Sequence, residues 1–167
     1  MTYEDDDETL RLLPGYIFDP TDGVLVEFYL KRRVFSQRLP IQIIPDLMFF
    51  RLNLGVYQKE VDEKIFYECK FFFYNTMDRD FKNIDKRVAG SGQWRVIEKG
   101  KDVPIPGNNE VSGKRNTLNF WEVQESCARR TKWVMHEFRL VLVADPIKVN
   151  LEYKNLLTIF ILIIKIE

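Results

Sequence analysis

Four stretches rich in aromatic and β-favouring residues constrain the fold of this 167-residue chain more than any other feature. They lie at 64–75, 87–97, 116–124 and 132–143, and turn-like segments rather than helical patterns separate them. Strands that follow one another without an intervening helix pair in an antiparallel sheet. The sequence therefore predicts an antiparallel sheet as the body of the molecule.

One helix is predicted ahead of this sheet. The segment 19–22 offers Asp and Thr side chains that accept hydrogen bonds from the free amides of a first helical turn. Leu25, Phe28 and Tyr29 then recur at helical spacing, and the basic run 31–33 suits the C-terminal end of a helix dipole. A short strand is predicted at 10–13, and a short helix plus a loop between 39 and 58. A sheet covered by one or two helices belongs to the α+β class.

The length suits one domain with a hydrophobic core and is short for two. We expect a flexible acidic tail at 1–9, a domain at 10–143 and a short C-terminal segment at 144–167. The apolar run 156–164 in that segment has nine residues, whereas a membrane-spanning helix needs ~20. It is a strand or helix that packs on the domain, an exposed aggregation-prone stretch, or a truncated anchor.

The net charge of zero hides an asymmetry along the chain. Residues 1–78 carry 9 Lys and Arg against 14 Asp and Glu, whereas residues 79–139 carry 13 against 8. An acidic first half followed by a basic second half hints at nucleic acid or a membrane as partner.

Candidate catalytic and metal-binding residues are sparse. His136 is the single histidine and stands in an apolar strand, where a hydrogen-bonded structural role is expected. Cys69 and Cys127 lie far apart without a nearby second cysteine, which indicates neither a zinc site nor a disulfide scaffold and favours a reducing compartment. The segment 90–92 lacks the GxSxG pattern of a nucleophile elbow. We therefore expect no enzyme, no cofactor and no small-molecule substrate.

A basic, glycine-punctuated strand remains as the candidate site. Arg87 and Arg95 flank the glycines at 90 and 92, which permit close backbone approach to a partner. An arginine fork matches phosphates or the edge of guanine, and a β-ribbon fits the major groove of DNA. The alternative is an ordinary hairpin with solvated charges.

Three motifs resemble the NAC family of plant transcription factors. Residues 12–22 (LLPGYIFDPTD) resemble the family's LPPGFRFHPTDEEL, residues 89–95 (AGSGQWR) resemble AAGSGYWK, and residues 131–140 (TKWVMHEFRL) resemble TNWIMHEYRL. They occur in family order across roughly 10–142. The resemblance implies a twisted antiparallel sheet flanked by a few helices, a dimer, and a strand that enters the major groove.

The resemblance also implies which basic residues contact DNA. Two match groove-facing positions, and the others, including a basic loop before the third motif, would hold phosphates. The set is Arg87, Arg95, Lys99, Lys101, Lys114, Arg115, Arg129, Arg130 and Lys132. Where the family has WKATG, this chain continues Trp94 and Arg95 with Val96, Ile97 and Glu98, which predicts a weakened or altered site preference.

The dimer element departs from the family as well. The family joins two N-terminal strands with an arginine–glutamate salt bridge, and Ile17 and Val24 occupy those two positions here. Replacing both charges by apolar groups leaves neither unpaired. We therefore expect a dimer interface made by Leu12, Pro14, Gly15, Ile17 and Val24.

The leading prediction is a nuclear, sequence-specific DNA-binding domain that regulates transcription as a homodimer or as a heterodimer with other NAC proteins. Membrane association is not expected. The alternative is a dimerisation module with weak or no DNA affinity that titrates its relatives, which Glu98 favours because phosphate repels a carboxylate.

Overall fold

The computed structural model describes residues 17–39, 42–47, 70–76, 86–89, 92–105, 107, 111–142 and 159–166. Within these residues the chain forms one helical segment followed by a seven-stranded sheet. The predicted strand at 10–13 and the acidic tail lie outside the described residues. The predicted antiparallel sheet is confirmed, whereas only one of the flanking helices is present in the described part.

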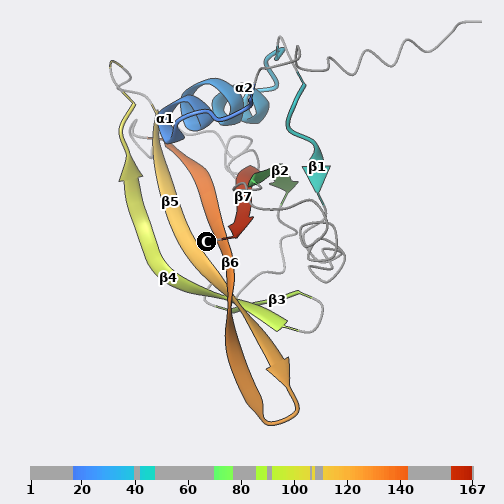
Figure 1. The fold of residues 1–167 in the computed structure, drawn as a ribbon. Coiled ribbons are helices and arrows are strands. Elements are labelled where there is room, and N and C mark those ends of the chain that lie inside the picture. The colour runs from blue at the N-terminus through green and yellow to red at the C-terminus, as the bar shows by residue number, and fades with distance from the viewer. Residues whose placement is uncertain are drawn as a thin grey trace, which may run out of the picture.

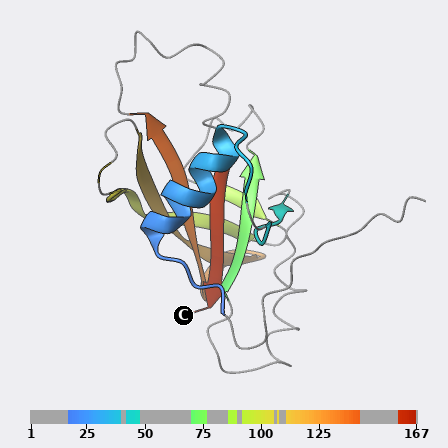
Figure 2. The ribbon, with the colours of Figure 1, turned by 90° about the horizontal axis from the view of Figure 1, so that it is seen from above.

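The helical segment begins after Thr21, as predicted. It comprises α1 (Asp22–Val24), the π-helical turn η1 (Leu25–Leu30) and α2 (Lys31–Val34). The Thr21 side chain accepts a hydrogen bond from the Val24 amide at 3.4 Å, which caps the first turn. The segment lies across one face of the sheet (Figure 2).

The wider π-helical turn changes which side chains of this segment face the sheet. The predicted helical spacing grouped Leu25, Phe28 and Tyr29 on one face, but Phe28 and Tyr29 are only half-buried. A π-helix closes its hydrogen bonds over five residues instead of four, so the apolar face is shifted along the sequence. The side chains that are buried against the sheet are Leu25, Val26, Leu30 and Val34.

The sheet has the strand order β1-β2-β7-β6-β5-β4-β3 (Figure 1). All neighbouring strands are antiparallel except β1 and β2, which are parallel. The bounds are β1 (Asp46–Leu47), β2 (Lys70–Thr76), β3 (Lys86–Ala89), β4 (Gly92–Val103), β5 (Val111–Gln124), β6 (Cys127–Leu142) and β7 (Ile159–Ile166). Of the segment 39–58, where a short helix was predicted, the described residues contain β1 and no helix.

The described part of the C-terminal apolar run, 159–164, lies in β7, an interior strand of the sheet. Its residues pair antiparallel with β2 on one side, through Phe73 and Leu162 for example, and with β6 on the other, through His136 and Ile163. The described residues 159–166 are thus a strand of the sheet itself. Among the described residues, no helix is long and apolar enough to cross a membrane.

Strands β5 and β6 form a long twisted hairpin that projects away from the helical segment (Figure 1). The strand β3 and the start of β4 lie where this hairpin leaves the body of the sheet. Trp94 and Phe120 are buried at this place, with ring centroids 5.2 Å apart. This aromatic pair packs across the β4–β5 ladder next to Arg95 and supports the strands that carry the candidate site.

Candidate nucleic-acid interface

Arg95 on β4 is held by two neighbours on the same face of the sheet. Its guanidinium carbon lies 4.4 Å from the centroid of the Trp121 ring on β5. In the amide orientation that satisfies both of its polar atoms, the Gln93 oxygen accepts from Nη2 of Arg95 at 2.7 Å and from Nε at 3.1 Å. A guanidinium stacked on a ring and hydrogen-bonded along one edge keeps one orientation. The end formed by its two terminal nitrogens keeps hydrogen-bond donors that Gln93 does not use.

Trp121 was missed by the sequence predictions, although the sequence carries a signal for it. In the strand β5 the buried Phe120 precedes Trp121, and alternation places the tryptophan on the other face. A large aromatic at an outward position of an alternating strand indicates a contact with another side chain or a partner. The register of the sheet places Gln93 and Arg130 on either side of Trp121.

Three further cations extend this surface along β6. Arg129, Arg130 and Lys132 are exposed, and within the described part of the chain none of them forms an ion pair. They were predicted in a loop, but the structure places them on a strand that pairs with β5. A cation without an acidic partner is available to an anion at no cost of breaking an existing pair.

A bulge in β6 orients these cations. The register with β5 shifts between Asn119 and Trp121. The hydroxyl of Thr131 donates to the Phe120 carbonyl at 2.8 Å and accepts from the Trp133 amide at 3.2 Å, so the irregular backbone is satisfied. Bulges bend a strand and re-aim its side chains. Here the bulge lies between the buried core residue Trp133 and the exposed arginines.

Other members of the predicted basic set are occupied within the protein. Lys114 forms an ion pair with Asp102, and Lys101 lies 3.9 Å from a carboxylate oxygen of Glu98. The guanidinium of Arg115 contacts Asp22 at 2.7 Å and Glu98 at 3.4 Å, and its side chain is only 18% exposed. The geometry of Arg115 is that of a residue joining the start of the helical segment to β4.

The two remaining residues of the predicted basic set lie on β4 and β3. Lys99 is exposed on β4. Arg87 on β3 pairs in register with Trp94, and its side chain lies outside the described part. The structure thus places Arg129, Arg130 and Lys132 on the projecting hairpin and Arg95 on β4 beside it, and it holds Lys101, Lys114 and Arg115 in ion pairs.

The half-exposed carboxylate of Glu98 contacts several neighbouring groups. Besides Arg115 and Lys101, the Thr117 hydroxyl donates to it at 3.3 Å. Ile97, the residue before it, is 56% exposed. The two residues that depart most from the family motif therefore point to different neighbours, the carboxylate to the protein and the isoleucine to solvent.

His136 has a hydrogen-bonded structural role, as predicted. Its Nδ1 lies 3.2 Å from the Thr117 hydroxyl, and the ring centroids of His136 and Phe138 are 6.5 Å apart. Among the described residues, no group of three or more His, Cys, Asp or Glu side chains is placed to hold a metal ion. Cys127 is exposed in the projecting hairpin.

Two of the predicted dimer residues belong to the described part of the chain, and both have exposed apolar side chains. Ile17 is 88% exposed and Val24 is 44% exposed. Leu12, Pro14 and Gly15 lie outside the described residues. Both side chains are thus exposed apolar groups that a dimer interface would bury.

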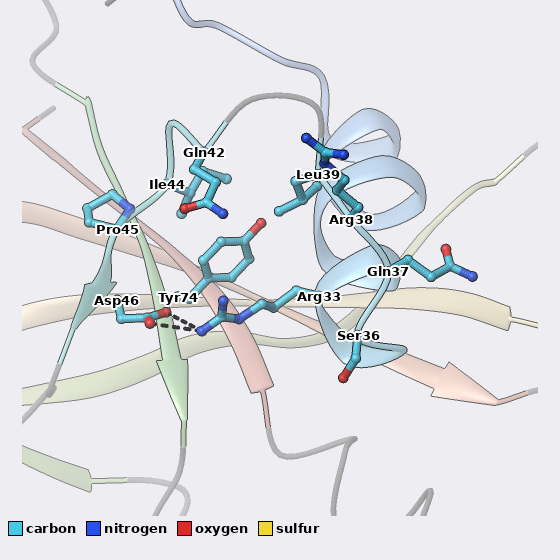
Figure 3. A pocket seen from close by; sticks show the side chains of 10 residues that line it. All are labelled: Arg33, Ser36, Gln37, Arg38, Leu39, Gln42, Ile44, Pro45, Asp46 and Tyr74. Carbon is cyan, nitrogen blue, oxygen red and sulfur yellow. Dashed lines mark hydrogen bonds and ion pairs between the residues drawn. The ribbon is translucent and has the colours of Figure 1, made fainter. Parts of the chain in front are cut away.

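A hollow of about 650 Å³ lies between the end of α2 and the strands β1 and β2 (Figure 3). Arg33 crosses it and donates to both carboxylate oxygens of Asp46 at 2.8 Å, so its charge is already paired. The Tyr74 hydroxyl donates to the Tyr29 carbonyl at 3.3 Å, and burial raises the pKa of this phenol well above its usual range. Arg33, Asp46 and the Tyr74 hydroxyl are therefore already paired within the protein.

The chain is a sheet-built domain that carries exposed arginines on a projecting hairpin. Its described residues contain no cluster of metal-binding side chains. The family model of the No apical meristem (NAM) protein matches residues 13–140. The chain belongs to this family of plant NAC domains, and the resemblance carried by the three sequence motifs is confirmed.

Named relatives agree with this assignment. NAC domain-containing protein 83 of Arabidopsis thaliana is 35% identical over 133 residues, which are 78% of this chain and 50% of the relative. Protein ATAF2 of the same plant is 33% identical over 84% of this chain and 48% of the relative. NAC domain-containing protein 2 of Oryza sativa subsp. japonica is 32% identical over 81% and 42%. The chain thus spans about half or less of the length of these relatives.

Proposed function

We propose that this chain binds double-stranded DNA with sequence preference and regulates transcription in the nucleus. The observation that carries the proposal is the set of exposed cations without ion pairs in the described part, Arg129, Arg130 and Lys132, beside the oriented guanidinium of Arg95. Free cations on a projecting hairpin suit the regular phosphates of a duplex, because each contact releases a condensed counterion.

The two kinds of arginine have different roles in this proposal. Gln93 occupies the Nε edge of Arg95, which leaves the end-on fork of Nη1 and Nη2 for the O6 and N7 acceptors of a guanine. Arg130, directly across from Trp121, and its exposed neighbours on β6 contact phosphates and set the position of the hairpin. Arg95 thus provides base preference and Arg130 provides affinity for any sequence.

The partner of this domain in the dimer is a second NAC domain. The exposed apolar residues Ile17 and Val24 support the proposal, with Leu12, Pro14 and Gly15 completing the interface. Because neither position carries a charge, association with relatives that use the salt bridge would leave a charge unpaired and is disfavoured. Sedimentation of the purified chain, alone and mixed with such a relative, tests this; a strict monomer contradicts it.

DNA binding is tested by selection from a random duplex pool, followed by anisotropy titrations on the enriched and on a scrambled duplex at two salt concentrations. Arg95→Ala should lose about 1–3 kcal/mol on the enriched duplex and much less on the scrambled one. Arg130→Ala should weaken both and make the slope of log K against log salt shallower by about 0.9. Lys114→Ala is the matched control, since its ammonium is paired with Asp102.

The second candidate function is that of a dimerisation module without useful DNA affinity. The half-exposed carboxylate of Glu98, in the strand where the family contacts DNA, favours it. The selection experiment separates the two functions, because a pool without any enriched sequence supports the second. Equal losses for Arg95→Ala and Arg130→Ala on both duplexes would contradict the division of roles.

A further inference from the structure

Ile97 is an exposed apolar residue with a cation two residues away on each side in the sequence. It is 56% exposed, and it follows the ordered guanidinium of Arg95 and precedes the exposed Lys99 by two residues each. Most exposed apolar side chains need no explanation when they stand alone on a polar surface. This one stands in the strand proposed to meet DNA, so its surroundings decide what it contacts.

A bulge of β4 separates Ile97 from the regular pairing. Val96 pairs with Leu118 and Glu98 pairs with Thr117, so Ile97 has no partner residue on β5. A residue in such a position is turned away from the ladder, and the strand bends there. A second shift follows between Glu98 and Lys101.

Specific hydrogen bonds hold this irregular stretch. Glu98 accepts from Thr117 and Arg115 at 3.3 and 3.4 Å, and the Gly100 amide donates to the Asn116 side chain at 2.8 Å. Gly100 has a φ of +67°, a conformation that favours glycine. The backbone on the C-terminal side of Ile97 is therefore fixed, and a β-branched side chain adds little freedom of its own.

The chemistry around Ile97 identifies its partner. Arg95 and Lys99 stand two residues before and after Ile97, and cations attract the anionic surface of a duplex, on which an apolar side chain is best placed against an apolar group. In the major groove the C5-methyl group of thymine is apolar, and 5-methylcytosine carries the same group.

We propose that Ile97 contacts the C5-methyl group of a pyrimidine in the major groove, so that the base preference at one position depends on this methyl. The inference rests on the proposed DNA binding and adds the group that is read. It implies a preference for thymine over unmodified cytosine at that position. It also implies that methylation of a cytosine there strengthens binding instead of blocking it.

The test changes only the methyl group. In the enriched duplex each thymine is replaced in turn by deoxyuridine, and a cytosine version of the sensitive position is compared with its 5-methylcytosine form. Burying about one methyl-sized group predicts a loss of about fourfold in affinity for deoxyuridine and a similar gain for 5-methylcytosine over cytosine. Ile97→Ala should abolish both differences. Val123→Ala, which shortens another exposed apolar side chain on the projecting hairpin, should keep them.

Each outcome has one meaning. A sensitive position for the unchanged chain and for Val123→Ala, but not for Ile97→Ala, supports the inference. If the chain selects and binds a duplex but no thymine can be replaced with loss, or if Ile97→Ala keeps the methyl effect, the inference is wrong while the proposed function stands. If no duplex is selected at all, the proposed function fails and the inference fails with it.

Discussion

Replacing Arg115 by methionine separates a structural role from a DNA-contacting one. The guanidinium contacts Asp22 at the start of the helical segment and Glu98 on β4, so one side chain joins three parts of the fold. Methionine has a similar length and keeps the packing of the aliphatic stem. We expect Arg115→Met to lower the free energy of unfolding and to leave the salt dependence of DNA binding unchanged.

The magnitude follows from distances and exposure. A charge-assisted hydrogen bond contributes about 1.5–3 kcal/mol when it is well shielded, and an exposed ion pair about 0.2–1 kcal/mol. Arg115 is 18% exposed, whereas Asp22 and Glu98 are 43% and 46% exposed, which places the two contacts between these limits. A combined loss of about 1–2 kcal/mol lowers the Tm of a chain of this size by about 2–8 °C.

Two measurements on the same protein samples provide the assay. Urea denaturation gives the free energy of unfolding, and anisotropy at several salt concentrations gives the slope of log K against log salt. Arg130→Ala is the complementary variant: its side chain is exposed and without an ion pair in the described part, so its stability should change by less than about 0.5 kcal/mol while the slope becomes shallower by about 0.9.

The reverse pattern would refute this reasoning. If Arg115→Met unfolds at the same urea concentration as the unchanged chain while its salt slope becomes shallower by about one phosphate contact, Arg115 binds DNA and the ion pairs are incidental. Loss of both stability and slope would assign it two roles and contradict the expectation of an unchanged slope.

Three further predictions concern the sheet. Gly92→Ala should lower the free energy of unfolding by about 1–3 kcal/mol or more, because its new Cβ would lie 2.3 Å from the Trp121 carbonyl oxygen. Gly100→Ala meets no atom within 4 Å and should lose only about 1–2 kcal/mol through backbone strain. Urea denaturation compares the two variants, and equal losses would contradict this expectation. Burial in the folded state raises the pKa of the Tyr74 phenol, so the stability linked to the neutral phenol is complete below the ordinary pKa of about 10 and is lost as the pH rises above it. Above that pH the unfolding midpoint of the unchanged chain should fall more steeply than that of Tyr74→Phe. Parallel curves of midpoint against pH for the two proteins would contradict this. Deleting 159–166 leaves β2 and β6 without seven registered pairs each, and sedimentation should show aggregates in place of a folded species; an unchanged, well-folded species would contradict the role of β7.

The strand pattern and the helix start were predictable because both depend on local chemistry. Alternation and aromatic content indicated β2, β4, β5 and β6, and the capping chemistry near Thr21 indicated the start of the helical segment. The buried face of that segment was not predictable, because a π-helical turn changes the spacing that the periodicity assumes.

The candidate site was predictable as a composition but not as a geometry. Sequence shows which side chains are cations, whereas their availability depends on partners far away in the chain. Arg115 and Asp22 are 93 positions apart, and Lys114 and Asp102 face each other only because β4 and β5 pair in one register. The stacking of Arg95 on Trp121 has the same origin.

The position of β7 sets the order in which this sheet is assembled during synthesis. β2 and β6 share the sheet only through β7, which the ribosome makes after both of them. Until 159–166 have been made, two strand edges face solvent with apolar residues beside them, a state that favours association with other chains. The β4–β5–β6 part, with its cations, can form earlier from neighbouring hairpins. The basic surface would thus form before β7 completes the sheet that carries it.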